Sequence, residues 1–169
     1  GLVEDLIERG IVDRSGPEMG GYAHFSSVLL WESVHRSILG VRLSEYHRMV
    51  ADAMERLYGD MLDDRRMDLA SHCAAGGQYL RAAGHAERGG DHLRSQQMIH
   101  PALACWEEGI GWLDRVNRPG HAARVKEATL RLKAGEGWRL AGDPRKAEIH
   151  LQVAQDLGED TGNSEVEAR

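Results

Sequence analysis

The residues of this chain that could bind a metal ion or act as a nucleophile are nine histidines and two cysteines. His72 directly precedes Cys73, and His85 and His92 stand two helical turns apart. Zinc sites are marked by closely spaced cysteine pairs or by the HExxH pattern, and the sequence contains neither. Adjacent side chains on a helix point about 100° apart, so His72 and Cys73 do not converge on one ion. We therefore expect no metal site, and we expect Cys73 and Cys105 to be buried.

The acidic and glycine-containing stretches also lack a catalytic pattern. The phosphate-binding pattern G-x-x-x-x-G-K-[ST] is absent, and "GDPRK" is typical of a turn between helices. The sequence places no partner carboxylate for Asp63 and Asp64, so we expect them to cap the helix containing Leu69 rather than to hydrolyse a glycoside. The sequence thus predicts a protein that is not an enzyme, with no catalytic residue and no cofactor.

Composition indicates a helical protein outside the membrane. The 169 residues are rich in alanine, leucine, arginine and glutamate, and four prolines stand where helices are expected to begin or end. A net charge of −6 disfavours general binding to nucleic acid or to an anionic membrane. No apolar run approaches the roughly 20 residues that span a bilayer, and no secretory signal opens the chain. Two cysteines without repeated spacing indicate reduced thiols, and we expect a cytoplasmic location.

The stretch "GWRLAGDPRKAEIHLQVA" predicts a helical hairpin. Gly142 can adopt the left-handed conformation that ends a helix, Asp143 can cap the next helix, and Pro144 fits its first turn. Small and large residues at helical spacing on both sides allow two helices to pack closely: Gly135, Trp138, Ala147, Leu151 and Ala154.

A pattern of small, large and small residues recurs along the chain, as Ala82/Ala86/Gly89, Ala102/Trp106/Gly109 and Ala147/Leu151/Ala154. Gly77 and Gly142 stand five residues before the first and last copies. The pattern resembles tetratricopeptide repeats, best from Leu132 to Glu159, although the copies do not follow that family's period of roughly 34 residues. Trp106 and Trp112 lie on an apolar stripe that we expect to be core.

The resemblance to tetratricopeptide repeats implies a surface lined by the first helix of each hairpin, where partners bind. It makes Thr129, Glu136, Trp138 and Arg139 the candidate partner-binding residues. The alternative is that Thr129, Glu136 and Arg139 are ordinary solvated surface and that Trp138 belongs to the core.

The N-terminal third has a different pattern. Leu2, Val3, Leu6 and Ile7 mark a short helix, and "DRSGPEMGGYAHF" predicts a short β-hairpin before Tyr22 and Phe25. Two further helices are expected, with apolar stripes at Val28, Trp31, Val34 and Ile38 and at Tyr46, Met49, Val50, Ala53, Leu57 and Met61. We expect residues 1–42 to be the end of a winged-helix-like unit.

The run from Leu2 to Val116 resembles the segment that follows the ATPase module in STAND-type signalling ATPases, such as large bacterial transcriptional activators and ATPase-linked cyclases or kinases. Ser27 and His35 depart from the family pattern, which has His and Tyr there. The residues that match it are Phe25, Glu32, His47, Ala51, Leu69, Ala70 and His72.

This resemblance implies a sensor arm: a mostly α fold in which the winged-helix-like unit precedes a solenoid of tetratricopeptide-like hairpins over residues 43–169. We interpret the chain as a fragment of a longer protein, with another repeat beginning near residues 164–168 and truncated there. The expected function is protein–protein interaction in signal transduction or transcription regulation, with a protein partner or the parent's own ATPase domain. Nucleic acid and membrane are not expected partners. The alternative is a DNA-binding winged helix with a helical oligomerisation arm, which the acidic residues of "LVEDLIERG" disfavour.

Overall fold

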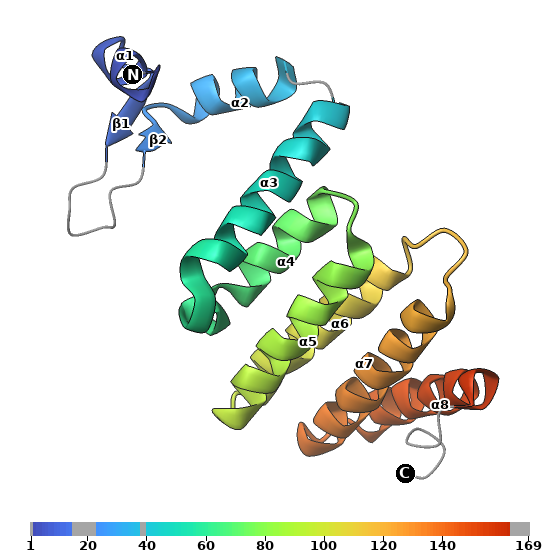
Figure 1. Cartoon of the computed structure of the whole chain (residues 1–169). Helices are drawn as coiled ribbons and strands as arrows, with labels where there is room; N and C mark the ends of the chain where they lie inside the picture. Colours follow the sequence, from blue (N-terminus) through green and yellow to red (C-terminus); the bar gives the residue numbers. More distant parts are fainter. Residues whose placement is uncertain (1, 15–22, 38–39, 163–169) are drawn as a thin grey trace. The chain divides into compact units, whose positions relative to one another are not determined.

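The computed structural model describes residues 2–14, 23–37 and 40–162, and it is mostly helical (Figure 1). The chain forms two units, residues 1–43 and residues 44–169. Tyr22, Ile38 and the repeat expected near residues 164–168 lie outside the described residues. Among the described helices, none combines the length and the apolar character needed to cross a bilayer.

The first unit contains a short helix, a strand pair and a second helix. These elements are α1 (Leu2–Glu8), β1 (Val12–Arg14), β2 (Ala23–Phe25) and α2 (Val28–Ser37). The strands are antiparallel, with Val12 opposite Phe25, as the predicted hairpin requires. The Ser26 hydroxyl donates to the Gly10 carbonyl at 2.6 Å, which joins the end of β2 to the turn after α1.

In the second unit, each helix from α4 to α8 packs against the next (Figure 1). The long α3 (Gly40–Tyr58) begins in the first unit and leads into the 3₁₀ helix η2 (Gly59–Arg65). After these come α4 (Arg66–Ala75), α5 (Tyr79–Ser95), α6 (Ile99–Leu113), α7 (His121–Leu140) and α8 (Pro144–Thr161). One buried cluster lies among α3, α4 and α5, and a second is centred on Trp106, Leu103 and Leu130. Trp106 and Trp112 are buried, as predicted.

Three of the helix connections share one turn geometry. In each, a residue with positive φ follows the first helix, at Gly77 (76°), Gln97 (64°) and Gly142 (83°). The N–H of the next residue bonds back to a carbonyl five positions earlier, which satisfies an unpaired end of the helix. These bonds are Gln78 to Cys73 at 2.8 Å, Met98 to Leu93 at 3.0 Å and Asp143 to Trp138 at 2.9 Å. The middle copy has the same turn although it lacks the glycine.

The irregular spacing of the sequence copies follows from the order of the helices. Helix α5 is both the second helix of the α4–α5 hairpin and the first helix of the α5–α6 hairpin. Ala82 and Ala102 therefore lie on successive helices, whereas Ala147 lies on α8, after the longer connection at residues 114–120 and the helix α7. The copies would recur at a fixed period only if every hairpin had two helices that it shared with no other hairpin.

Two helix starts differ from one another in their capping. The Asp143 side chain accepts a hydrogen bond from the Lys146 N–H at 3.0 Å and so caps α8, as predicted. The prediction that Asp63 and Asp64 cap the helix containing Leu69 was wrong. Both residues lie within η2, and Asp63 instead accepts from the Arg66 side chain at 2.7 Å. The 3₁₀ segment continues directly into α4, and no side chain caps the junction.

Candidate protein-interaction surface

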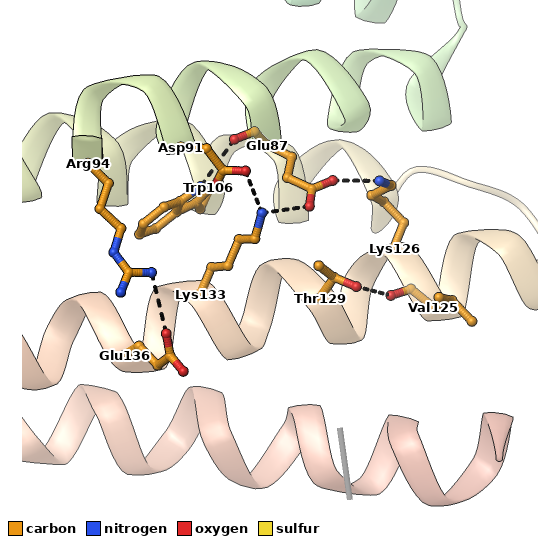
Figure 2. Close-up of polar contacts among 9 residues, drawn as sticks. All are labelled: Glu87, Asp91, Arg94, Trp106, Val125, Lys126, Thr129, Lys133 and Glu136. Atoms are coloured by element: carbon orange, nitrogen blue, oxygen red, sulfur yellow. Dashed lines mark hydrogen bonds and ion pairs between the residues drawn. The ribbon is translucent and has the colours of Figure 1, made fainter. Parts of the chain in front are cut away.

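Helices α5 and α7 direct a continuous set of polar side chains toward each other (Figure 2). We name this surface the α5–α7 face. Its residues are Glu87, Asp91 and Arg94 on α5 and Lys126, Thr129, Lys133 and Glu136 on α7. The spacing within each set is three or four residues, so each set occupies one side of its helix.

Glu87 lies at the centre of the ion pairs on this face. Its carboxylate oxygens accept from Lys126 Nζ at 2.5 Å and from Lys133 Nζ at 2.7 Å, and Lys133 also donates to Asp91 at 2.6 Å. The Glu87 side chain is only 14 % exposed. Burial by itself would raise the pKa of Glu87, but the hydrogen bonds and charges of the two lysines outweigh it and lower that pKa.

Two further contacts hold the α5–α7 face in place. The Arg94 guanidinium on α5 pairs with the Glu136 carboxylate on α7 at 3.4 Å, three residues after Asp91 and three residues after Lys133. The fully buried Trp106 of α6 donates its indole N–H to the Glu87 carbonyl at 3.4 Å. Because α5 and α7 are not successive in the chain, these polar contacts set the spacing between two hairpins.

The α5–α7 face combines groups of both charges. Three carboxylates and three cationic groups are arranged in alternating pairs, and the face contains no thiol or imidazole. Such a surface offers charge complementarity and hydrogen bonds to a partner, which favour specificity and association rate.

The four predicted partner-binding residues do not all lie on the same surface. Thr129 and Glu136 belong to the α5–α7 face, and the Thr129 hydroxyl donates to the Val125 carbonyl at 2.9 Å. Arg139 is exposed one helical turn beyond Glu136. Trp138 is directed toward other helices and does not join this face. Partner binding at the four residues stays a prediction.

Trp138 forms a separate cluster with α6 and α8. Its indole N–H donates to Glu107 Oε1 at 2.7 Å, and Lys146 Nζ lies 3.8 Å from the ring centre. His150 Nε2 lies 3.6 Å from the same Glu107 oxygen. These contacts join α6, α7 and α8, so the tryptophan acts mainly in packing the last hairpin.

Helix α3 is attached to α5 through a second set of charges. The Arg81 guanidinium donates to Asp52 and Glu55, both at 2.7 Å. The other oxygen of Glu55 lies 3.0 Å from Nε2 of His85, a residue only 3 % exposed, whose Nδ1 has no hydrogen-bond partner among the described residues. Burial lowers the pKa of His85, although Glu55 opposes that shift.

Among the described residues, the histidines and cysteines do not assemble into a metal centre. In the part of the chain that the structure describes, no group of three or more metal-ligating side chains is close enough to hold an ion. His72 Nδ1 lies 2.9 Å from His47 Nδ1, not beside the thiol of its neighbour. Cys73 and Cys105 are buried, as predicted, and burial raises the pKa of both thiols.

Glu87, Lys126 and Lys133 were not among the predicted site residues. Their sequence signal is the spacing of charges on each helix, at 87, 91 and 94 and at 126, 133 and 136. That signal is equally typical of a solvated helix face. Only the pairing of α5 with α7, two helices apart in the chain, shows that the two charged stripes meet.

Comparisons with known proteins give no relative for this chain: no family model, no curated protein and no solved structure matches it.

Proposed function

We propose that this chain is a non-catalytic protein-interaction and sensor module of a larger STAND-type signalling or regulatory ATPase. In this proposal the hairpins of residues 43–169 form a tetratricopeptide-like solenoid, and residues 1–42 are the end of a winged-helix-like unit. The bound partner is a protein or the ATPase domain of the same parent protein.

The observation that carries this proposal is the α5–α7 face. In tetratricopeptide-like arrays the first helices of successive hairpins line the partner-binding surface, and α5 and α7 are the first helices of the α5–α6 and α7–α8 hairpins. Ion pairs between Glu87, Lys126 and Lys133 hold these two helices together without help from a partner. A surface that is already ordered loses little conformational entropy on binding.

Signalling by such a module depends on differential affinity. A partner that prefers one arrangement of the arm shifts the parent ATPase toward that arrangement, by no more than the difference in its two binding free energies. The residues described here then act as a rigid contact surface.

A DNA-binding winged helix is the second candidate. Helix α1 carries Glu4 and Asp5 in its first turn, and Arg9 is paired with Asp5 at 3.0 Å. Acidic residues repel phosphate, so this helix is poorly suited to contact DNA. Retention of DNA with a steep salt dependence would nevertheless favour this candidate over the first.

Affinity capture with charge-reversal variants tests the proposal. The chain is used as bait in an extract of the source cells, and any captured protein is purified and its Kd is measured. Arg139→Glu should weaken binding at least about tenfold, the effect of losing one hydrogen-bonded charge in an interface. Arg145→Glu, an exposed change on α8, is the matched control and should leave the Kd unchanged. A partner that binds both variants like the wild type would refute the assignment of this surface.

A further inference from the structure

A groove separate from the α5–α7 face lies where two helix connections meet. It is formed by the turn into α5, residues 77–81, and by the segment after α6, residues 115–117. Its volume is about 780 Å³, within the range of pockets that hold small organic ligands. Both segments belong to the second unit.

The lining of this groove is mostly apolar. Tyr79, Leu80 and Val116 supply its apolar surface. The Leu80 residue is 40 % exposed. Exposed apolar side chains around a hollow are typical of a ligand site, because a ligand removes them from water. Burial of apolar surface contributes about 25 cal/mol per Å². A ligand that covers even part of these three side chains therefore gains binding free energy.

Two arginines line the groove, and they differ in their pairing. The Arg81 guanidinium is engaged by Asp52, Glu55 and Gln78. Arg115 is exposed, and its guanidinium has no hydrogen bond or ion pair with any residue in the described ranges. Arg115 is therefore the group in this lining that is available to bind an anion, and its fork of donors matches a carboxylate.

The N-terminal end of α5 also favours a negative group in the groove, although it does not make a binding site by itself. No side chain caps this helix at Gln78, and the positive end of its dipole lies in the groove lining. The apolar lining and the available arginine together require a ligand with an apolar body and one negative group.

We propose that this groove binds a small apolar carboxylate, a medium-chain aliphatic or an aromatic acid. Its apolar body lies against Tyr79, Leu80 and Val116, and its carboxylate is bound by Arg115. The inference does not depend on the proposed protein partner, because none of these residues belongs to the α5–α7 face.

Titration with a matched pair of probes tests the inference. The ¹⁵N-labelled full chain is titrated with octanoate and, separately, with octanol, which has the same chain length without the charge. We expect saturable shifts of the amide signals of residues 77–81 and 115–117 with octanoate. We also expect octanoate to bind at least about tenfold more tightly than octanol, the usual effect of one charge-assisted hydrogen bond.

Two variants identify the group that binds the carboxylate. Arg115→Gln should remove the difference between octanoate and octanol, whereas Arg118→Gln, an exposed arginine outside the lining, should preserve it. The thermal midpoint of each variant should match that of the wild type. Absence of saturable shifts at these amides would overturn the groove as a ligand site. Equal affinity for the two probes, or an unchanged preference in Arg115→Gln, would overturn the carboxylate assignment.

Discussion

The backbone of Gly135 on α7 lies directly against the side chain of Leu151 on α8, and a β-carbon added to Gly135 would stand 2.6 Å from Leu151 Cγ. The same relationship occurs in the α5–α6 hairpin, where a β-carbon on Gly90 would overlap the indole of Trp106. In both hairpins a large side chain of the second helix fills the space that a missing β-carbon leaves on the first helix. This interlock fixes the distance between the paired helices.

Substitution of Gly135 should therefore destabilise the protein although alanine is the better helix former. We expect Gly135→Ala to lower the free energy of unfolding by about 1–3 kcal/mol, the cost of forcing a methyl group into a packed core, and Gly135→Leu to lower it further. Gly111 is the matched control, because it lies within α6 and a β-carbon added there would meet open space. Gly111→Ala should raise the free energy of unfolding by about 0.5–1 kcal/mol in urea titrations. Equal effects at the two positions would refute the interlock.

Replacement of Gln97 by glycine should stabilise the protein. It has φ of 64° in the turn where the other two copies have Gly77 and Gly142. A side chain in this conformation is strained by about 1–2 kcal/mol, so Gln97→Gly should raise the free energy of unfolding by about 0.5–1 kcal/mol after the added entropy of the unfolded chain is subtracted.

The adjacent Gln96, with φ of −86°, provides the control for this turn. Gln96→Gly should destabilise the protein, because no strain is relieved there and the unfolded chain gains freedom. Thermal unfolding of the two variants should thus give midpoint shifts of opposite sign. Shifts of the same sign would contradict the shared turn geometry.

The sequence predicted the last hairpin well because its signals are local. Gly142, Asp143 and Pro144 end one helix and start the next through their own backbone preferences, and the structure has the positive φ, the cap and the proline in the first turn. The middle turn was not predicted, because Gln97 stands where the other two turns have glycine. The predicted capping role of Asp63 was wrong, because Asp63 lies within the 3₁₀ segment η2 and its carboxylate instead accepts from the Arg66 side chain.

Glu87 should contribute to stability through its two lysines. Glu87→Gln leaves Lys126 and Lys133 without their shared carboxylate, so we expect the free energy of unfolding at pH 7 to fall by about 1–3 kcal/mol. Glu148→Gln, an exposed change on α8, should alter it by no more than about 0.5 kcal/mol. Urea titration of both variants measures the difference.

The lowered pKa of Glu87 also gives a direction for the pH dependence of this contribution. Its stabilisation is fully present above the unfolded pKa of about 4.3 and is lost as pH falls through the folded value. The difference between wild type and Glu87→Gln should therefore shrink as pH falls from about 5 toward about 3. A difference that stays constant over this range would contradict the ion-pair role.

His85, which is buried, and His150, which is partly buried, should make the protein less stable in mild acid. Burial lowers the pKa of His85 and of His150, so the unfolded chain takes up protons below about pH 6.5 that the folded chain does not. The free energy of unfolding should fall as pH drops from about 7 to about 5. His85→Gln should reduce this slope in a series of urea titrations. An unchanged slope would mean that His85 takes up its proton equally in the two states.

The α5–α7 face could be anticipated only in part. Thr129 and Glu136 were identified from their places on the first helix of the best hairpin, and both lie on this face. Glu87 and Asp91 lie on α5, whose sequence copy Ala82/Ala86/Gly89 lacks the large central residue, so the sequence did not assign them to a first helix. Trp138 was included because it lies on the first helix of the same hairpin, yet its side chain bonds Glu107 of α6 and does not join the α5–α7 face.

Site-specific photo-crosslinking tests the central claim, that a partner binds beside the α5–α7 face, most directly. A photoreactive phenylalanine is placed at Leu140, 62 % exposed at the end of α7, or at Ile149, 55 % exposed on α8. The two sites are matched in residue type and exposure, and irradiation is carried out in extract of the source cells. We predict a discrete protein adduct from position 140 and none from position 149. An adduct from position 149 alone, or from neither position, would contradict the account.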